Sequence, residues 1–323
     1  MQYRLKKITS DASSREFYRL YKGNKSSIIV FTKKEMFKNL ILYSSINKFL
    51  RSYGILAPKI ISQNFNKGFM EIEDFGEISL FNKIKNSKKK LRFYKQCVDV
   101  IIKIQKIYPI KKILLPKKKY FRFNKYDLKN LQNESDLFFN WYLKGTIKKK
   151  IPQKAITQLK KELRNIYQKI HYKNNFLVHR DFHVSNIMVL GKKLGVIDTQ
   201  DAIIGNPAYD LVSLIDDVRL SIPLKMKKEI FNYYVKKNFL TKEEIIKFKN
   251  DFDILSIQRN LKILGIFYRL FKRDKKPRYL KMMPSAWKLI DLRIKSKIFN
   301  KFRSQLDIIV SKAHKKRYLY YEN

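Results

Sequence analysis

Residues 179–186 read His-Arg-Asp-Phe-His-Val-Ser-Asn, and twelve residues after Asn186 another aspartate, Asp198, ends an apolar run. A phosphoryl group that moves to a hydroxyl needs a carboxylate beside that hydroxyl, and Asp181 can supply it. The transfer also needs oxygen ligands for Mg²⁺, a hard cation that prefers carboxylate and amide oxygens. Asn186 and Asp198 offer two such ligands, so this stretch predicts a phosphoryl-transfer site.

The spacing His-x-Asp-x-x-x-x-Asn is that of a kinase catalytic loop. Apolar runs at 176–178, 187–190 and 194–197 predict a strand before the loop and a hairpin after it, which turns at Gly191. The hairpin would bring Asn186 and Asp198 to the same end. Any one of these residues alone would be explained by a turn or a strand end, but all of them at this spacing favour a catalytic site.

The rest of the chain divides into a strand-rich beginning and a helical remainder. Helical periodicity is expected over 34–53, and from residue 79 onward helices are expected at 91–107, 128–143, 152–171 and from 206. Strands are expected at 3–7, 16–22, 26–31, 57–61 and 68–73. We therefore predict an α+β fold of two lobes, a small β-rich N-lobe over 1–76 and a large helical C-lobe over 77–323.

The charge is strongly positive, with 72 Lys and Arg against 27 Asp and Glu and a formal net charge of +45. Such a balance suggests nucleic acid or an anionic membrane as partner. The basic residues, however, are spread along the whole chain, and Lys, Ile, Asn, Phe and Tyr are all abundant, which is typical of a genome-wide compositional bias. We expect no specific nucleic-acid partner and only nonspecific polyanion binding at low salt.

The cysteine content and the apolar runs indicate a compartment. Cys97 is the single cysteine, so an internal disulfide is impossible and a reducing environment is expected. The first seven residues contain no apolar stretch after their charges, and no apolar run reaches the ~20 residues that cross a bilayer. The sequence predicts a cytoplasmic protein without a membrane span.

Several further segments extend the pattern beyond the catalytic loop. They are residues 10–17 (Ser-Asp-Ala-Ser-Ser-Arg-Glu-Phe), 73–76 (Glu-Asp-Phe-Gly), 196–202 (Val-Ile-Asp-Thr-Gln-Asp-Ala), 209–214, 258–267 and 276–280. Together with the loop they resemble the aminoglycoside phosphotransferase family, and within it the anomeric N-acetylmuramate/N-acetylglucosamine kinases of cell-wall recycling. The resemblance implies a protein-kinase-like fold with a nucleotide-covering loop and hinge in the N-lobe.

The resemblance also implies roles for individual residues. Asp181 matches the catalytic base, and Asn186 and Asp198 match the Mg²⁺ ligands. Residues 10–15 lie where the fold places its phosphate-covering loop, although the usual glycines are missing and an ordinary polar turn is an equal alternative. ATP-binding residues are then expected at Ser13, Ser14, Arg15 and Glu73, the last within the adenine-binding hinge.

Six more residues near these motifs have expected roles. Those that could face the phosphate or the acceptor are Arg180, His183, Gln200 and Asp201. Two others are expected to support the loop without doing chemistry, His179 through hydrogen bonding and Asp210 in the first turn of a helix, where its charge complements the dipole.

The sequence departs from the family pattern at the early strand, which lacks the lysine that pairs with nucleotide phosphates. Arg15, Arg19 and Lys33 are the candidates to replace it, and the sequence does not choose among them. Thr199 stands where an aromatic residue is typical and is expected to tune activity without abolishing it. Asp74 begins an Asp-Phe-Gly triplet, but it precedes the catalytic loop, so it is not expected to bind the metal.

These features predict an ATP- and Mg²⁺-dependent kinase of an amino sugar, whose anomeric hydroxyl would be phosphorylated to give a sugar 1-phosphate. One alternative is a kinase of another small hydroxyl compound, such as choline, another sugar or an aminoglycoside. The other is a non-catalytic basic binding protein on a kinase-like scaffold, against which the intact Asp181, Asn186 and Asp198 argue.

Overall fold

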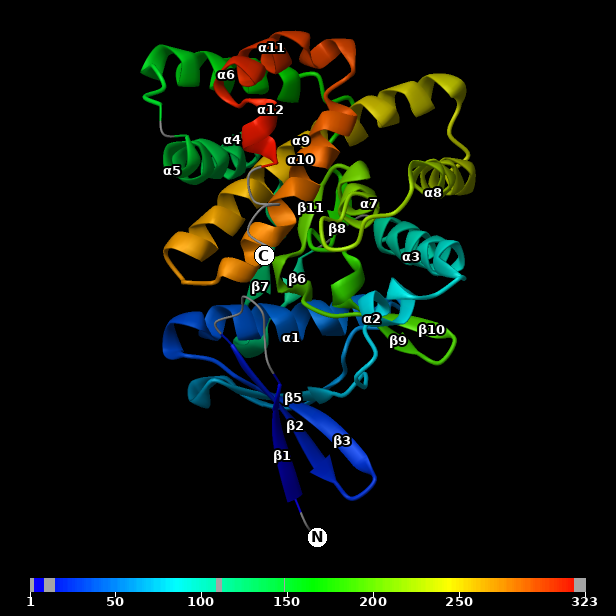
Figure 1. Cartoon of the computed structure of the whole chain (residues 1–323). Coiled ribbons are helices and arrows are strands. Elements are labelled where there is room, and N and C mark those ends of the chain that lie inside the picture. The colour runs from blue at the N-terminus through cyan, green and yellow to red at the C-terminus, as the bar shows by residue number, and fades with distance from the viewer. Residues whose placement is uncertain (1–2, 9–14, 109–111, 148, 317–323) are drawn as a thin grey trace. The chain divides into compact units, whose positions relative to one another are not determined.

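The computed structural model describes residues 3–8, 15–108, 112–147 and 149–316, and the chain folds as two compact units (Figure 1). The first unit comprises Met1–Asn124 and Phe176–Ile204, and the second comprises Lys125–Asn175 and Gly205–Asn323. The division reflects which segments pack together, and it places Phe176–Ile204 in the same unit as the N-terminal part of the chain. A division into lobes at residue 76 stays a prediction.

An antiparallel sheet of five strands begins the first unit, with the order β1-β2-β3-β5-β4. Its strands are β1 Tyr3–Ile8, β2 Glu16–Lys22, β3 Lys25–Phe31, β4 Ile60–Asn64 and β5 Phe69–Glu73. Four of the five expected strands are confirmed. The fifth was expected at 57–61 and begins only at Ile60, because Pro58 has no N–H to donate to a sheet.

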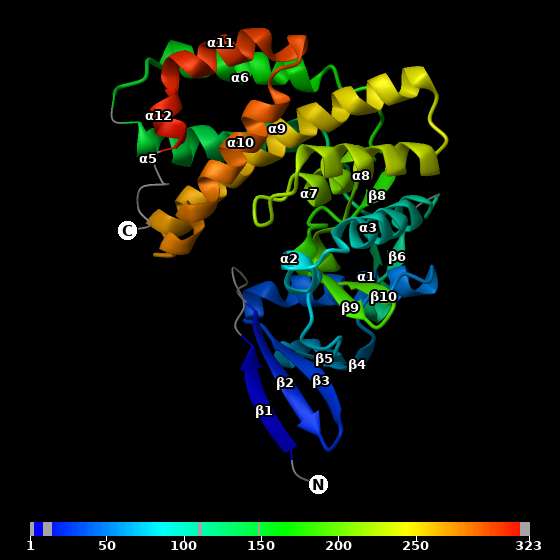
Figure 2. The same cartoon turned by 45° about the vertical axis from the view of Figure 1, so that its right-hand side comes forward.

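One helix, α1 Phe37–Ser52, covers one face of this sheet after a short 3₁₀ turn, η1 Lys34–Met36 (Figure 2). The helix expected over 34–53 is thereby confirmed. Its apolar side meets the alternate residues of β3 and β5 that point toward it. The buried cluster between them consists of Val30, Leu40, Tyr43, Met70 and Ile72. Polar residues on this side of α1 therefore need partners inside the protein.

The remainder of the first unit leads to and contains the expected hairpin. Its elements are α2 Leu80–Lys85, α3 Lys90–Gln105, β6 Ile113–Leu114, η3 Pro116–Lys118, β7 Tyr120–Phe121, β8 Phe176–Val178, η5 Val184–Asn186, β9 Ile187–Leu190, β10 Lys193–Val196 and η6 Thr199–Asp201. Strand β11 Ile203–Gly205 follows, and its last residue belongs to the second unit. Strands β9 and β10 pair antiparallel around a turn in which Gly191 has φ of 60°. The hairpin predicted from the apolar runs is confirmed, and it lies beside α2 (Figure 1).

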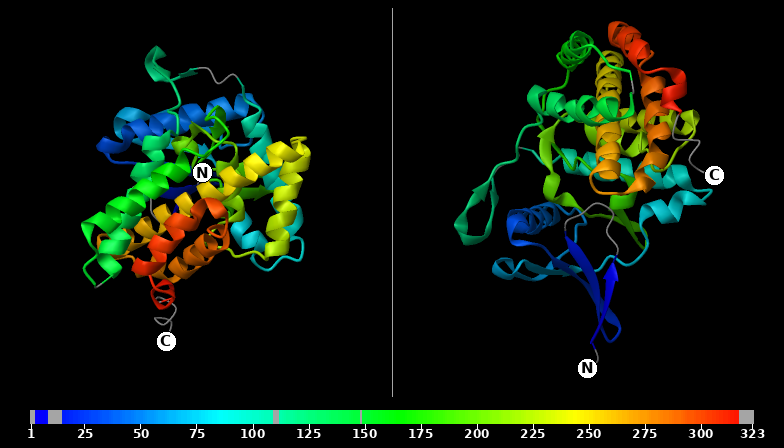
Figure 3. Two further views of the ribbon diagram at one scale, coloured as in Figure 1. Left: turned by 90° about the horizontal axis from the view of Figure 1, so that it is seen from above. Right: turned by 60° about the vertical axis from the view of Figure 1, so that its left-hand side comes forward.

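The second unit is built from helices around α9 Lys242–Lys272, the longest of the described elements at 31 residues. The others are α4 Leu128–Leu137, its π-helical continuation η4 Phe138–Leu143, α5 Lys144–Thr146, α6 Gln153–Tyr167, α7 Ala208–Ile215, α8 Leu224–Lys237, η7 Pro277–Met282, α10 Met283–Arg293, η8 Lys297–Phe299, α11 Asn300–Ile309 and α12 Lys312–Lys315. A capping box of Thr241 and Glu244 starts α9. Helix α10 packs alongside α9, both drawn in gold and orange in Figure 3.

Most of the expected helices are found, with small shifts at their ends. The helix expected from residue 206 begins at Ala208, with Pro207 at the N-cap position and the Asn206 side chain accepting from the Ala208 N–H at 2.9 Å. Aromatic side chains fill the core of this unit, where Phe138 stacks on Tyr142 and Trp287 donates to the Tyr142 hydroxyl at 2.8 Å. None of the helices in the described part of the chain is long and apolar enough to cross a membrane.

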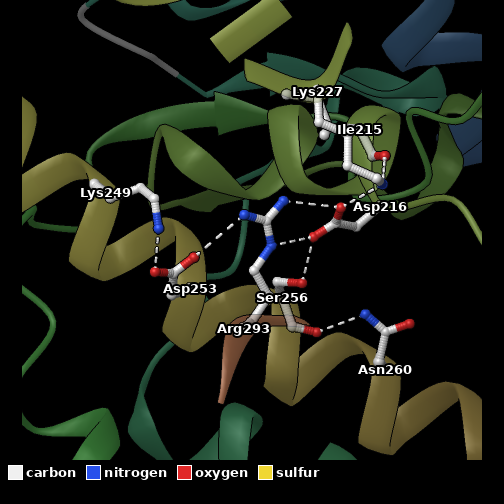
Figure 4. Close-up of polar contacts among 8 residues, drawn as sticks. All are labelled: Ile215, Asp216, Lys227, Lys249, Asp253, Ser256, Asn260 and Arg293. Carbon is white, nitrogen blue, oxygen red and sulfur yellow. Dashed lines mark hydrogen bonds and ion pairs between the residues drawn. The ribbon is translucent and has the colours of Figure 1, made fainter. Parts of the chain in front are cut away.

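A buried ion cluster joins the end of α7 to three other helices (Figure 4). Asp216 is fully buried and pairs with Lys227 at 2.8 Å and with Arg293 at 2.9 Å, while Ser256 donates to its second oxygen at 2.6 Å. Burial alone would raise the pKa of Asp216, but the two cations outweigh it and lower the pKa to about 2. The cluster therefore holds a charged carboxylate in the interior.

We expect Asp216→Asn to lower the free energy of unfolding by about 3–5 kcal/mol, because it leaves two buried cations without their shared anion. The control Glu243→Gln removes an ion pair with Lys247 on the exposed face of α9 and should leave stability nearly unchanged, because solvent screens such pairs. Urea unfolding measures both changes. Since the folded-state pKa of Asp216 is depressed, its contribution is present above the ordinary value of 3.8 and is lost as the pH falls from there toward 2. Equal stabilities of the two variants at neutral pH would contradict this account.

Candidate active site

The loop between β8 and β9 is a tight turn that its own backbone and one side chain hold together. The Asp181 carbonyl accepts from the His183 N–H at 3.0 Å and from the Asn186 side-chain amide at 3.1 Å. Arg180 has φ of 76°, in the left-handed region that residues other than glycine seldom adopt. Such strain persists where the surroundings enforce it, and it concentrates at functional sites. The loop therefore presents Asp181 on a preformed turn.

Asp198 follows β10 and is brought next to this loop by the hairpin. The Ile197 N–H donates to the Asn186 carbonyl at 3.0 Å, and the His179 ring donates from Nε2 to the Ile197 carbonyl at 3.0 Å. Asp198 itself is in the left-handed region, with φ of 65° and ψ of 42°. His179 is buried, and its contact with the Ile197 carbonyl links the start of the loop to the residue before Asp198.

The side chain that meets Asp198 most closely is Arg15, from the segment just before β2. Its guanidinium donates to Asp198 Oδ1 at 2.6 Å and to Gln200 Oε1 at 3.2 Å. It also lies over the rings of Phe17 and Tyr43, with its centre 5.4 and 5.8 Å from their centroids. Only 10% of the Arg15 side chain is exposed, against 38% for Asp198. Arg15 is thus a mostly buried cation, packed on two aromatic rings, that pairs with a more exposed carboxylate.

The donor atoms at this place suit a hard divalent cation that completes its shell with phosphate oxygens and water. Asn186 uses its Nδ2 to hold the Asp181 carbonyl, which leaves the amide oxygen on the opposite side of the group. Asp198 adds a partly exposed carboxylate. Within the described ranges, no three His, Cys, Asp or Glu side chains are close enough to hold a metal by themselves. Mg²⁺ commonly binds through one or two carboxylates and substrate phosphates, so the residues fit that ion.

The three candidates for the missing strand lysine have different surroundings. Arg19 is buried and donates to Asp74 Oδ2 at 2.6 Å and to the Gly76 carbonyl at 3.0 Å, and it also pairs with Glu77. Lys33 is exposed just before η1. Of the three candidates, Arg15 is the one whose charge lies at Asp198.

Asp74 is used for structure. Burial alone would raise its pKa, but hydrogen bonds from Arg19 and Ser26 outweigh burial and lower it. Both of its oxygens accept hydrogen bonds, from Arg19, from Ser26 at 2.7 Å and from the Gly76 N–H at 2.8 Å. This supports the expectation that its Asp-Phe-Gly triplet is not a metal motif.

The segment around Glu73 attaches the sheet to the hairpin. Glu73 accepts from the Lys59 N–H at 3.0 Å and from Arg51 at 3.2 Å, so its side chain ties β5 to the chain before β4. Two residues later, the Phe75 ring lies against Gly195 of β10 so closely that a Cβ added there would be 2.5 Å from it. Glycine is therefore required at position 195 by this contact.

Two backbone hydrogen bonds reinforce the attachment of the hairpin. The Val196 N–H donates to the Leu56 carbonyl at 2.7 Å, and the Val189 N–H donates to the Ile78 carbonyl at 3.0 Å. The hairpin strands are thus bonded to segments on both sides of β5. The candidate loop and the N-terminal sheet consequently form one packed body.

The remaining expected residues are placed as follows. His183 is buried within the loop, and Arg180 is half-buried beside Asp181. Gln200 donates to Asp198 at 3.1 Å and to the exposed Asp201 at 2.8 Å. Asp210 is fully buried in the first turn of α7, in the second unit. Ser13 and Ser14 lie outside the described residues.

Two residues at this place were not expected from the sequence, Tyr43 and Asn47 of α1. Tyr43 is part of the sheet–helix core and supports Arg15, and Asn47 is fully buried and accepts from the Thr199 hydroxyl at 2.5 Å. Tyr43 and Asn47 are four residues apart, a spacing that indicates only the buried side of a helix. The one feature of the sequence that could have pointed to a role here is the polar Asn47 on that side, because a buried amide needs a partner.

Comparison with known proteins gives a consistent family. The family model described as phosphotransferase enzyme family (APH) matches residues 4–235. The chain is 26% identical over 290 residues to the N-acetylmuramate/N-acetylglucosamine kinase of Pseudomonas aeruginosa, with 88% of this chain and 82% of that protein covered. It is 28% identical over 293 residues to the protein of the same name from Pseudomonas putida, with 88% and 81% covered.

Solved structures with the same fold include kinases of different small molecules. Choline kinase LicA from Streptococcus pneumoniae superposes with a TM-score of 0.60 at 13% identity, covering 90% of this chain and 92% of that one. The ADP-bound aminoglycoside phosphotransferase APH(2'')-Ib gives a TM-score of 0.59 at 14% identity, covering 93% and 94%. The kinase-like fold predicted from the sequence is confirmed.

We expect Gly195→Ala to lower the free energy of unfolding by about 1–3 kcal/mol, because the new methyl group overlaps the Phe75 ring. Combining it with Phe75→Leu should cost less than the sum of the single changes, since the smaller side chain makes room. The matched control Gly191→Ala introduces strain at a positive φ with open space around it. Its effect should add to that of Phe75→Leu. Additivity in both pairs would rule out the Phe75–Gly195 contact.

Proposed function

Because the chain belongs to the APH phosphotransferase family, we propose that it transfers the γ-phosphoryl group of ATP to the anomeric hydroxyl of N-acetylmuramate or N-acetylglucosamine. The observation that carries the proposal is the convergence of Asp181, Asn186 and Asp198 on one loop and hairpin. The choice of acceptor rests on sequence likeness to relatives of that name over more than four fifths of the chain.

In the proposed reaction, the Asp181 carboxylate orients the sugar C1 hydroxyl and accepts its proton. A bond forms between the hydroxyl oxygen and the γ-phosphorus, and the bond from that phosphorus to the β,γ-bridging oxygen breaks, so that ADP and a sugar 1-phosphate result. Positioning supplies much of the rate in such transfers, because the reacting oxygens must lie in line. The preformed turn around Asp181 suits this requirement.

Asn186 and Asp198 would hold Mg²⁺ through an amide oxygen and a carboxylate oxygen. Held there, a Mg²⁺ ion would supply positive charge that offsets the negative charge of the nucleotide phosphates. Arg15 would move from Asp198 to the nucleotide phosphates, because a guanidinium can donate two parallel hydrogen bonds to two oxygens of one phosphate group. Within the same proposal Ser13 and Ser14 contact the phosphates, and the Glu73 backbone contacts the base, since its side chain is engaged elsewhere.

The remaining expected residues keep their proposed parts. Arg180, His183, Gln200 and Asp201 surround Asp181 and Asp198 in the sequence and are assigned to the acceptor and its phosphate. His179 and Asp210 are assigned to support. Because the reaction consumes ATP, we place the protein in the cytoplasm, with polyanion binding as a nonspecific consequence of its charge.

A kinase of choline or of an aminoglycoside is the competing proposal. The structural neighbours that act on those compounds share the fold at 13–14% identity, which leaves the acceptor open. The sequence relatives that match this chain over most of its length are named for amino sugars, and this favours the sugar.

Purified protein should consume ATP in the presence of N-acetylmuramate or N-acetylglucosamine and should be far slower with choline or kanamycin. Asp181→Asn should reduce turnover about 10²–10⁴-fold, because the base is lost while the shape of the side chain is kept. The control Asp307→Asn makes the same change at an exposed position of α11 and should leave turnover unaltered. Turnover of Asp181→Asn near the wild-type rate would refute the assigned role.

A further inference from the structure

The side-chain amide of Asn47, on helix α1, is buried against the segment that carries Asp198. Asn47 is fully buried, and its two side-chain atoms have different partners. Oδ1 accepts from the Thr199 hydroxyl at 2.5 Å, and Nδ2 donates to the Pro58 carbonyl at 3.2 Å. Thr199 is itself fully buried and directly follows Asp198 in the chain. The amide thus connects the helix, the segment before β4 and the turn after β10.

We propose that Asn47 and Thr199 are positioning residues that hold Asp198 in its metal-binding conformation. The inference deepens the proposed function and rests on it for the assignment of Asp198 to Mg²⁺. Neither residue would touch the metal or the substrates. Their effect would pass through the backbone of the turn.

The conformation of Asp198 explains why such a hold is needed. Asp198 has φ and ψ in the left-handed region, which crowds the Cβ of residues other than glycine, so the turn would relax if nothing fixed its ends. On one side, Ile197 is fixed by hydrogen bonds to His179 and Asn186. On the other side, the Thr199 hydroxyl is fixed by Asn47. The strained residue is therefore held at both of its neighbours.

The same helix also contacts the cation that faces Asp198. Tyr43 lies one turn before Asn47, and the Arg15 guanidinium lies over its ring. Burial raises the pKa of Tyr43 to about 12, so the ring remains neutral near physiological pH. Through Tyr43 and Asn47, α1 determines where Asp198 and its counter-charge stand. A shift of the helix would disturb both.

The identity of Thr199 points to the hydroxyl as the feature that matters. A buried polar pair needs its hydrogen bond, because a buried donor or acceptor left alone keeps its full desolvation cost. An apolar pair of similar size at positions 47 and 199 would pack without that penalty. A hydrogen bond, unlike apolar packing, fixes the orientation of the groups that it joins. The residue next to a metal ligand needs a fixed orientation, because it sets how the ligand is placed.

The test uses full-length protein and titrates the non-hydrolysable nucleotide AMP-PNP by calorimetry, with and without Mg²⁺. Thr199→Val removes the hydroxyl at almost constant shape and should weaken Mg²⁺-dependent binding about 10- to 100-fold, the usual effect of losing a group that orients a metal ligand. Binding without Mg²⁺ should stay the same.

Two further variants test the hydrogen bond itself. Thr199→Ser keeps the hydroxyl and should restore the affinity for Mg²⁺ and nucleotide to within about threefold of wild type. Asn47→Ala combined with Thr199→Val should weaken binding no more than the stronger single change, because both remove the same hydrogen bond.

Thr146→Val is the matched control. Thr146 is buried in the second unit, where its hydroxyl donates to the Tyr142 carbonyl at 2.8 Å and contacts His314 at 2.9 Å. The variant should lose stability without any change in Mg²⁺ dependence. Unaltered Mg²⁺ dependence in Thr199→Val, or an equal loss in Thr146→Val, would overturn the inference. If Thr199→Val fails to fold, Asn47→Ala alone must show the same Mg²⁺-specific loss.

The proposed function can fail separately in the same experiment. Wild-type protein whose AMP-PNP binding ignores Mg²⁺ would remove the metal assignment before any variant is compared. Wild-type protein that binds Mg²⁺ and nucleotide together, with Thr199→Val unaffected, would keep the assignment and reject only the positioning role.

Discussion

The attachment of the β9–β10 hairpin to the N-terminal sheet unit is the constraint on which the candidate site depends. Asp198 stands at the end of β10 in a strained conformation, and Asn186 stands at the start of β9. Their separation is set by pairing within the hairpin, and their place in the unit is set by its bonds to Leu56 and Ile78 and by the Phe75 contact. Loosening any of these would move both oxygen donors relative to Arg15.

Carboxylates are scarce in this chain, and several of them hold elements of the structure together. The chain has 27 acidic side chains for 72 basic ones, so most of its cations cannot have a carboxylate to themselves. Several of its buried or half-buried carboxylates occupy joints of the structure. Asp216 ties α7 to the neighbouring helices, Asp74 ties β2 to the end of β5, and Asp198 meets Arg15. Because carboxylates are few, the loss of any of these three would leave buried or half-buried cations without their anion.

Local patterns in the sequence were enough to predict most elements and the geometry of the hairpin. Short strand-like segments indicated β1, β2, β3 and β5, and short apolar runs around Gly191 indicated β9 and β10. The catalytic-loop spacing led to Asp181, Asn186 and Asp198, and the longer motifs led to the correct family. The predicted elements and family are confirmed, because each depended on residues close together in the chain, whereas the roles of Asp181, Asn186 and Asp198 remain predictions.

What the sequence could not provide are the contacts between distant segments. Arg15 and Asp198 are 183 positions apart, and Asn47 and Thr199 are 152 apart. No local pattern relates such pairs, so the sequence could not show that Arg15, and not Arg19, lies at Asp198. Which residue replaces the strand lysine for phosphate contact remains a prediction. The roles of Arg180, His183, Gln200 and Asp201 remain predictions, because they concern a substrate and not the fold.

The measurement that tests the account most directly is phosphorus NMR of the product formed from ATP and N-acetylmuramate or N-acetylglucosamine. The account predicts a sugar phosphate whose phosphorus signal is split by the anomeric proton, together with an equal amount of ADP. A 6-phosphate product would contradict the proposed position of transfer. No turnover of either sugar, with activity on choline or an aminoglycoside, would contradict the proposed acceptor.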